Sequence, residues 1–166
     1  VGPESTGKST ISEQLADHYQ TVWVPEYARS YCEKLTAPCT WQDEINMFRG
    51  QLELEQQMAI NARRILICDT TFITVKIWSD HMFGSAPQEV LDKLPHHPYD
   101  LYLLMNIDLP WQEDPLRDFP DKREHFMEVW HTELKALNAN YFLISGSDND
   151  RLQNAIQCID SFMIDK

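Results

Sequence analysis

The stretch GPESTGKS at residues 2–9 decides the fold class, because it fits the pattern G-x-x-x-x-G-K-[ST] of a phosphate-binding P-loop. Glycine lets the backbone N–H groups turn around a phosphate, the lysine supplies positive charge, and the final hydroxyl can bind Mg²⁺. Ile11, Leu15 and Tyr19 follow at helical spacing. A helix beginning at Lys8 would therefore point its positive N-terminal dipole at the anion.

These features predict ATP and Mg²⁺ as ligands, and the alternative is a chance glycine-rich turn. We expect the ATP-binding residues to be Gly2, Glu4, Ser5, Thr6, Gly7, Lys8, Ser9 and Thr10, with Ser9 also a metal ligand.

Short apolar runs alternate with helical patterns along the rest of the chain, which is typical of an α/β fold with a parallel sheet. The apolar runs are 21–24, 65–68, 101–107 and 141–144, and the predicted helices include 8–19, 72–83, 121–137, 148–163 and one that follows an N-cap at Thr40. A strand should precede a P-loop, but only Val1 does so here. We therefore predict a P-loop NTPase fold with a parallel five-stranded sheet whose first strand is largely missing from this chain.

The composition fits a single domain spanning residues 1–166, with 43% hydrophobic and 24% charged residues. The formal net charge of −12 argues against a nucleic-acid-binding surface, although basic side chains can still converge locally. No apolar run has the length of a membrane span. The four cysteines show no CxxC spacing, so we expect a reducing, cytoplasmic environment.

Asp69 directly follows the apolar run 65–68 and is the predicted carboxylate ligand of Mg²⁺. The alternative is an N-cap for the following helix. Thr70 comes next, where a motor-type ATPase usually carries a water-activating Glu, and residues 106–108 lack the Lys of a guanine-reading N-K-x-D motif. Both absences favour a kinase.

Glu26 follows the run 21–24 and is a candidate general base for an acceptor hydroxyl. Arg29 lies three residues later, on the same helical face, where it could bind substrate or phosphate oxygens. The alternative is a surface capping residue beside a solvated arginine.

The irregular stretch 110–123 is a predicted lid, in which Arg117 and Arg123 would neutralise charge on the transferring phosphate. The alternative is a solvated loop with surface ion pairs to Asp114, Asp118 or Asp121.

The segments GPESTGKS, VPEYAR, CDTTFITVKIWS, YDLYLLM and DLPWQEDPLRDFPDKR together resemble the kinase domain of bacterial ribosylnicotinamide kinases. The resemblance runs from Val1 to about Ser147, and VPEYAR and P-W-x-x-D-x-x-R are its specific parts. It implies a P-loop NTPase fold of the nucleoside-kinase type with the strand order 2-3-1-4-5. It also implies phosphorylation of the 5′-hydroxyl of nicotinamide riboside by ATP. Pro115 departs from the family pattern, where a glycine is expected.

Carried over by position, the resemblance implies catalytic roles for Lys8, Glu26, Asp69, Arg117 and Arg123. We expect a substrate site formed by Glu26, Tyr27, Arg29, Asp69, Trp78, Trp111 and Asp114, whose aromatic members could face the cationic pyridinium or simply belong to the core. The turn Ser145–Ser147 could approach the adenine, or serve only as a turn.

The resemblance leaves open a fused upstream domain or a homo-oligomer. The adenylyltransferase and DNA-binding domains found upstream in such proteins are outside this chain, so neither activity is assigned. Two other functions remain open: a P-loop kinase for another nucleoside or small alcohol, and a nucleotide-binding regulatory module.

Overall fold

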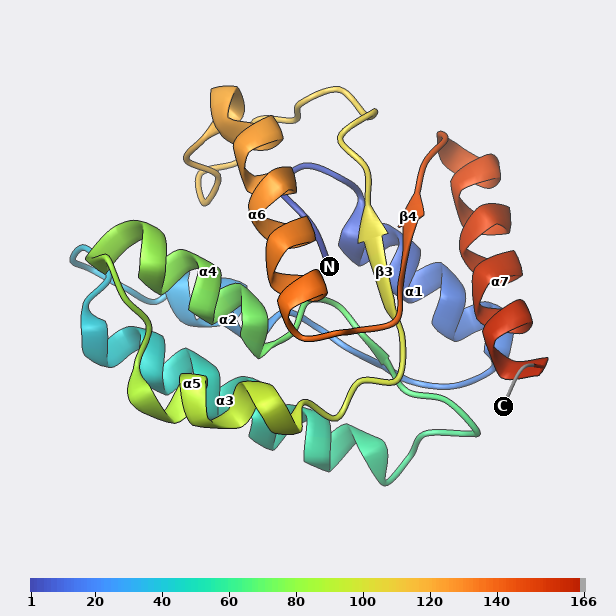
Figure 1. Cartoon of the computed structure of the whole chain (residues 1–166), viewed down its shortest axis with the longest axis horizontal. Coiled ribbons are helices and arrows are strands. Elements are labelled where there is room, and N and C mark those ends of the chain that lie inside the picture. Colours follow the sequence, from blue (N-terminus) through green and yellow to red (C-terminus); the bar gives the residue numbers. More distant parts are fainter. Residues whose placement is uncertain (165–166) are drawn as a thin grey trace. The chain divides into compact units, whose positions relative to one another are not determined.

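The computed structural model describes residues 1–164, in which helices and short parallel strands alternate along the chain (Figure 1). The elements are α1 (Lys8–Tyr19), β1 (Trp23–Val24), α2 (Tyr27–Cys32), α3 (Trp41–Ala59), β2 (Ile67–Cys68), α4 (Phe72–Phe83), α5 (Gln88–Lys93), the 3₁₀ turn Leu94–His96, β3 (Tyr102–Met105), the 3₁₀ turn Pro120–Lys122, α6 (Arg123–Ala136), β4 (Tyr141–Ile144) and α7 (Asp148–Ile164). The chain divides into two compact units: Val1–Leu15 with Pro98–Lys166 is the first unit, and Ala16–His97 is the second.

The first unit is built around the parallel pair β3 and β4, which run side by side from Tyr102 opposite Tyr141 to Met105 opposite Ile144 (Figure 1). Val1 lies against β3: its terminal amine donates to the Leu103 carbonyl at 3.0 Å, and its carbonyl accepts from Met105 N at 2.9 Å. Val1 therefore forms the hydrogen bonds of a further strand beside β3, which places the P-loop directly after that position.

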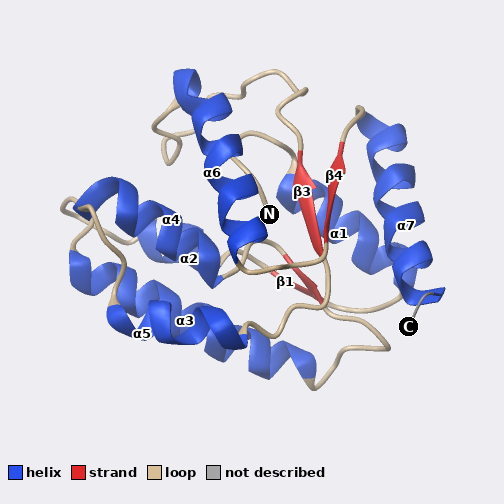
Figure 2. Ribbon diagram, in the orientation of Figure 1, coloured by secondary structure: helices blue, strands red, loops and turns tan. Residues whose placement is uncertain are grey.

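The second unit pairs β1 with β2 in parallel, in the register Trp23–Ile67 and Val24–Cys68. Around this pair the unit is mainly helical (Figure 2), and α3 packs against both α2 and α4. Phe48 of α3 meets Phe72 of α4 edge to face, with ring centroids 5.6 Å apart. Both rings are buried, so this contact forms part of the core of the unit.

Local signals in the sequence account for several helix ends. The Thr40 side chain accepts from Asp43 N at 3.3 Å, and Asp43 Oδ2 accepts from Thr40 N at 2.8 Å, which is a complete capping box at the start of α3. Gly84 ends α4 in the left-handed region, at φ 79°.

The parallel α/β class is confirmed, and the pairs β1–β2 and β3–β4 agree with neighbours in the predicted strand order. The strands of the described residues form two two-stranded sheets, beside the Val1 pairing and an isolated antiparallel bridge between Arg63 and Ile65. The strands β1 and β2 are shorter than the apolar runs 21–24 and 65–68. A side chain explains the difference: Thr21 Oγ1 donates to the Ile65 carbonyl at 2.7 Å and accepts from Arg63 N at 2.9 Å. The Thr21 hydroxyl thus takes the place of the backbone hydrogen bonds that would extend the pairing of β1 with β2.

One predicted helix boundary differs from the structure, and one helix was not predicted. The helix expected from residue 121 begins as a 3₁₀ turn at Pro120 and becomes α-helical at Arg123. The six-residue helix α5 was not predicted, because so short a segment carries little periodicity. Among the helices of the described chain, none has both the length and the apolar character needed to cross a membrane.

Candidate active site

The phosphate-binding loop has a backbone that requires its glycines. Gly2 has φ 133°, and a Cβ on it would lie 2.9 Å from the Met105 carbonyl oxygen. Gly7 has φ 76°, and a Cβ there would lie 3.2 Å from Leu109 Cδ1. Ser5 also adopts the left-handed region, at φ 56°. Both motif glycines are therefore required by backbone conformation, and by the closeness of β3 for Gly2 and of the Leu109 side chain for Gly7.

Side chains of the loop itself bind one of its carbonyl oxygens. Thr6 Oγ1 donates to the Pro3 carbonyl at 2.9 Å, and Lys8 Nζ donates to the same oxygen at 2.7 Å. The Gly7 carbonyl accepts from Ile11 N at 3.0 Å, which is the first bond of α1. These hydrogen bonds hold the carbonyl oxygens away from the space where an anion would bind, because a carbonyl that rotated towards the anion would lose its bond.

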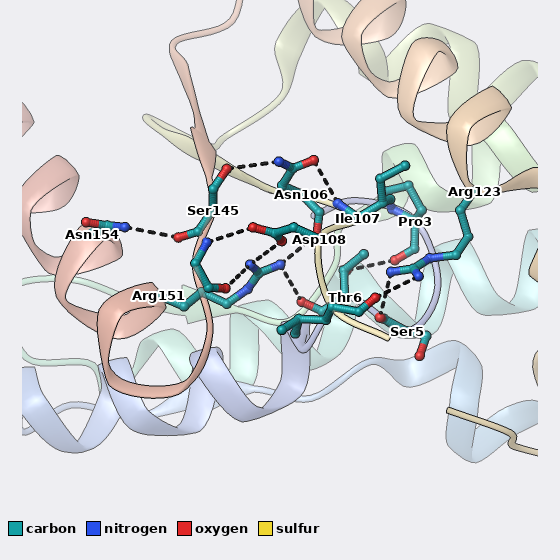
Figure 3. Close-up of polar contacts among 12 residues, drawn as sticks. Pro3, Ser5, Thr6, Asn106, Ile107, Asp108, Arg123, Ser145, Arg151 and Asn154 are labelled. Carbon is teal, nitrogen blue, oxygen red and sulfur yellow. Dashed lines mark hydrogen bonds and ion pairs between the residues drawn. The ribbon is translucent and has the colours of Figure 1, made fainter. Parts of the chain in front are cut away.

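Two arginines from distant segments bind two further carbonyls of the loop (Figure 3). Arg123 Nη2 donates to the Ser5 carbonyl at 3.0 Å, and Arg151 Nη2 donates to the Thr6 carbonyl at 3.1 Å. Arg123 also donates to the Leu109 carbonyl at 2.8 Å. Desolvation lowers the pKa of Arg123, and the positive charge of Arg151 lowers it further. The predicted lid arginine Arg123 is thus bonded to the loop backbone.

The stretch 110–123 is tied to the loop by its own backbone, since Gln112 N donates to Ser5 Oγ at 2.8 Å. Arg117, the other predicted lid arginine, donates to the Gln112 carbonyl at 2.6 Å. Asp114 Oδ1 accepts from Leu116 N at 2.9 Å, and the Asp114 carbonyl accepts from Arg117 N at 3.0 Å. Pro115 therefore takes the second position of a closed turn, a place that suits proline.

Trp111 and Glu4 also belong to this region. The Trp111 indole Nε1 is buried and has no hydrogen-bond partner among the described residues. Burial raises the pKa of Glu4, and this effect outweighs the hydrogen bonds from the backbone of Phe119 and Asp118 and the attraction of Lys8.

Arg151 was missed by the sequence reasoning, which gave only the range 148–163 for its helix. It lies in the first turn of α7 and is 2% exposed. A usable signal existed, because a cation in the first helical turn opposes the helix dipole and so needs another reason to be there.

Asp108 is the anionic partner of Arg151, and its Oδ1 accepts from Arg151 Nη1 at 2.7 Å. Its Oδ2 accepts from Gly146 N at 2.7 Å. Desolvation favours the neutral acid, but these hydrogen bonds and the charge of Arg151 together lower the pKa of Asp108. The carboxylate is therefore held ionised beside the loop.

In the second unit, Asp69 lies at the end of β2 and is 2% exposed. Its N–H donates to the Val24 carbonyl at 2.8 Å, while its Oδ1 is buried with no hydrogen-bond partner among the described residues. Thr71, not Asp69, caps α4, since its side chain accepts from Ile73 N at 3.3 Å. The capping alternative for Asp69 is therefore wrong. Thr70, between them, has the strained φ of 67°.

The orphaned oxygen of Asp69 fits a ligand that supplies a proton or positive charge, such as Mg²⁺, a metal-bound water or an acceptor hydroxyl. No cluster of three or more His, Cys, Asp or Glu side chains suited to a metal occurs in residues 1–164. A nucleotide-bound Mg²⁺ needs none, because it is usually held by one or two protein oxygens together with phosphates and waters. Ser9, with its exposed hydroxyl, and Asp69 are of the right chemical type.

Glu26 occupies the N-cap position of α2, two residues beyond β1, but its side chain makes no capping hydrogen bond. The Tyr27 N–H donates instead to Gln51 Oε1 at 3.0 Å, and Gln51 Nε2 donates to Glu55 Oε1 at 2.9 Å. Because β1 and β2 are parallel, Glu26 and Asp69 follow the same edge of this strand pair. Gln51 thus binds the N–H of the first residue of α2, and Glu26 does not cap this helix with its side chain.

Tyr27 is fixed by a glycine in the middle of α3. A Cβ on Gly50 would overlap the Tyr27 ring, so the ring occupies the space that a side chain at residue 50 would fill. The ring of Tyr31 lies 6.2 Å from that of Tyr27, and its hydroxyl donates to Asp43 Oδ1 at 2.7 Å. These tyrosines form an ordered aromatic face on α2.

Arg29 is half-buried on the same short helix as Tyr27. Trp78 is half-buried on α4, with its ring edge to face with His81 at 6.2 Å. The second unit therefore brings Glu26, Tyr27 and Arg29 together on one element, whereas Trp78 lies on another. Their contacts with a substrate remain predictions.

Comparison with known proteins adds independent information. The model of the AAA domain family (AAA_28) matches residues 1–151. The chain is 24% identical to the trifunctional NAD biosynthesis/regulator protein NadR of Salmonella typhimurium, over 98% of this chain and 42% of that protein. The corresponding NadR of Escherichia coli is 23% identical, over 96% of this chain and 40% of its own length. The chain thus spans less than half the length of these relatives.

A solved structure of NadR protein in complex with NR superposes with a TM-score of 0.78 at 20% identity, covering 98% of this chain and 49% of that one. This likeness supports the P-loop NTPase fold, and together with the NadR sequences it confirms the resemblance read from the motifs. Since the matching family model extends over most of the sequence, we conclude that the chain belongs to the AAA domain family.

Proposed function

We propose that this chain is a P-loop kinase that transfers the γ-phosphoryl group of ATP to the 5′-hydroxyl of nicotinamide riboside, giving nicotinamide mononucleotide and ADP. The observation that carries the proposal is the loop 2–9, whose glycine conformations and bound carbonyls suit a triphosphate. The acceptor is proposed from the similarity to NadR proteins, one of which was solved with NR.

On the nucleotide side, the loop and the start of α1 would bind ATP through Gly2, Glu4, Ser5, Thr6, Gly7, Lys8, Ser9 and Thr10. Lys8 would stabilise the charge of the terminal phosphates, with Arg117 and Arg123 of the lid 110–123 adding positive charge. Ser9 and Asp69 would hold Mg²⁺, which when bound neutralises phosphate charge and orients the leaving group.

On the acceptor side, Glu26 would accept the proton of the 5′-hydroxyl as its oxygen attacks the γ-phosphorus. The new O–P bond forms while the bond from phosphorus to the ADP oxygen breaks, so the proton ends on Glu26 and the negative charge on ADP. Tyr27, Arg29, Asp69, Trp78, Trp111 and Asp114 would bind the nucleoside. An aromatic face is suited to its cationic pyridinium ring.

The protein would act as a single kinase domain in the cytoplasm, either as part of a longer protein or as a homo-oligomer. The net charge of −12 does not repel a cationic nucleoside and disfavours a nucleic-acid partner for this domain.

The test is an ADP-coupled assay with MgATP and a panel of nucleosides and small alcohols. We expect nicotinamide riboside to stimulate ADP release most strongly, and Glu26→Gln to lower kcat by about 10²–10⁴-fold while ATP affinity stays unchanged. Glu89→Gln is a matched control, because Glu89 pairs with Arg49 at an exposed site of the same unit. Stimulation by another compound alone would show that the acceptor is wrong, and full activity of Glu26→Gln would exclude the base role. Slow ATP turnover unaffected by every acceptor would favour the regulatory alternative.

A further inference from the structure

The peptide groups of the phosphate-binding loop can be orientated only if something holds their carbonyl ends. In a trans peptide the C=O and the following N–H point in opposite directions, and the described chain contains no cis peptide. A donor that holds the Thr6 carbonyl therefore also fixes the direction of the Gly7 N–H. That donor is Arg151 Nη2, at 3.1 Å.

The Arg151 guanidinium is placed by acceptors from separate segments of the first unit (Figure 3). Besides Thr6, it donates to the Asn106 carbonyl at 2.6 Å, just beyond β3, and to the Gly146 carbonyl at 2.7 Å, in the turn before α7. Asp108 Oδ1 accepts from Nη1 at 2.7 Å. The Arg151 guanidinium thus links the loop, the end of β3 and the turn after β4 by hydrogen bonds.

A buried charge with this arrangement is poorly explained by stability alone. The Arg151 side chain is 2% exposed and that of its partner Asp108 is 32% exposed. Burying a guanidinium gains little stability over packing apolar groups, because the charge loses its hydration. The planar fork of arginine can, however, fix several acceptors at set directions, which a lysine ammonium on a flexible stem cannot do. The guanidinium is therefore suited to holding loop geometry.

We propose that Arg151 is a positioning residue for the phosphate-binding loop, directing the Gly7 N–H towards bound phosphate through the Thr6 carbonyl. The proposal rests on the proposed kinase function, since it needs a nucleotide in the loop. Arg151 touches no reacting atom in this scheme. Its effect should therefore fall on nucleotide affinity and not on binding of the acceptor.

The test uses Arg151→Lys and measures, by calorimetry, binding of MgATP, of inorganic tripolyphosphate and of nicotinamide riboside. We expect both phosphate ligands to bind about tenfold more weakly, as for loss of one hydrogen bond to a charged group, with nicotinamide riboside affinity unchanged. Arg49→Lys is the matched control, because Arg49 forms an exposed ion pair with Glu89. It should leave all these affinities unchanged.

Three results would overturn the proposal: unchanged affinity for both phosphate ligands, weakened ATP with unchanged tripolyphosphate, or equal weakening of ATP and nicotinamide riboside. The second would place the effect at the nucleoside end, and the third would indicate general loss of structure. If Arg151→Lys does not fold, Asp108→Asn decides, because it removes the charge that faces Arg151 and keeps the side-chain size. ATP affinity equal to that of the unmodified protein would then exclude the positioning role.

Failure of the proposed function gives a different pattern. If the unmodified protein binds MgATP but phosphorylates no nicotinamide riboside, the proposed acceptor is wrong. The MgATP affinities of the unmodified protein and of Arg151→Lys still test the role of Arg151. If it binds neither ATP nor tripolyphosphate, both proposals fail.

Discussion

The loop 2–9 and the strand end at Asp69 are both predicted to serve the phosphate chemistry, but their hydrogen bonding differs. The carbonyls of Pro3, Ser5 and Thr6 each accept from a side chain of the first unit. Asp69, in the second unit, keeps a buried carboxylate oxygen without a partner. The loop is thus preorganised by hydrogen bonds within the protein, whereas the Asp69 carboxylate has an oxygen that only a ligand would pair.

The difference has a physical reason. A loop that binds an anion through N–H groups works best if those groups are already aligned, because no reorganisation is then needed on binding. A carboxylate that binds a cation or a hydroxyl must keep an oxygen uncommitted, and burial makes that oxygen costly. The rest of the fold must offset the free energy lost at this unpaired oxygen, and also the free energy lost to the strained backbone of Thr70.

The strongest test of this comparison replaces an aspartate by asparagine in each of the two regions. Asp69→Asn should lower kcat by about 10²-fold, as for loss of one electrostatic stabiliser. It should not lower the stability of the protein, because the substituted carboxylate has an unpaired buried oxygen. Asp108→Asn should lower stability, since it removes the charge that pairs with buried Arg151. The coupled assay and denaturant unfolding measure these effects, and an equal stability loss in both variants would contradict the comparison.

The pH dependence of stability should also differ between the units. Burial raises the pKa of Glu44, in α3, from 4.5 to about 7, while Cys39 Sγ donates to its Oε1 at 3.6 Å. Between these values the native state holds a proton that the unfolded chain has released. This contribution to stability is therefore complete below pH 4.5 and is lost as the pH rises to 7, by roughly 2–3 kcal/mol.

Denaturant unfolding should give a lower free energy of unfolding at pH 8 than at pH 5 for the unmodified protein. The difference between the two pH values should be smaller for Glu44→Gln. Comparing the two proteins removes the contribution of histidines. Asp108, whose pKa is lowered, contributes in the opposite sense: its stabilisation is present above its usual pKa of 3.8 and is lost as the pH falls below that value. An unchanged pH dependence in Glu44→Gln would rule out Glu44 as the source.

The smallest expected effect concerns Gly50. Alanine in a helix interior normally gains about 1 kcal/mol over glycine. Here a Cβ would overlap the Tyr27 ring, and overpacking costs about 1–3 kcal/mol, so we expect Gly50→Ala to lose roughly 1 kcal/mol and to raise KM for nicotinamide riboside. In a Tyr27→Leu background the same change should become neutral or stabilising, as a double-mutant cycle would show. Equal effects in both backgrounds would exclude the contact.

Several features could be predicted because their signals are local. The P-loop motif, the helix 8–19, the capping box at Thr40 and the stop of α4 at Gly84 each depend on residues that are close in sequence. The strand 141–144 was predicted with its observed bounds, because its apolar run is short and bounded by polar residues.

Other features needed the folded chain. Arg151 lies 145 residues from the Thr6 carbonyl that it binds, and Gln51 lies 24 residues from the Tyr27 N–H whose hydrogen bond it accepts. Pattern and propensity report on neighbours along the chain, so neither could reveal these bonds or the unpaired oxygen of Asp69. The sequence by itself determined that a phosphate-binding loop opens an α/β fold. The tertiary structure alone decided which distant side chains hold that loop and which carboxylate is left unpaired, because hydrogen bonding and burial depend on distances in space.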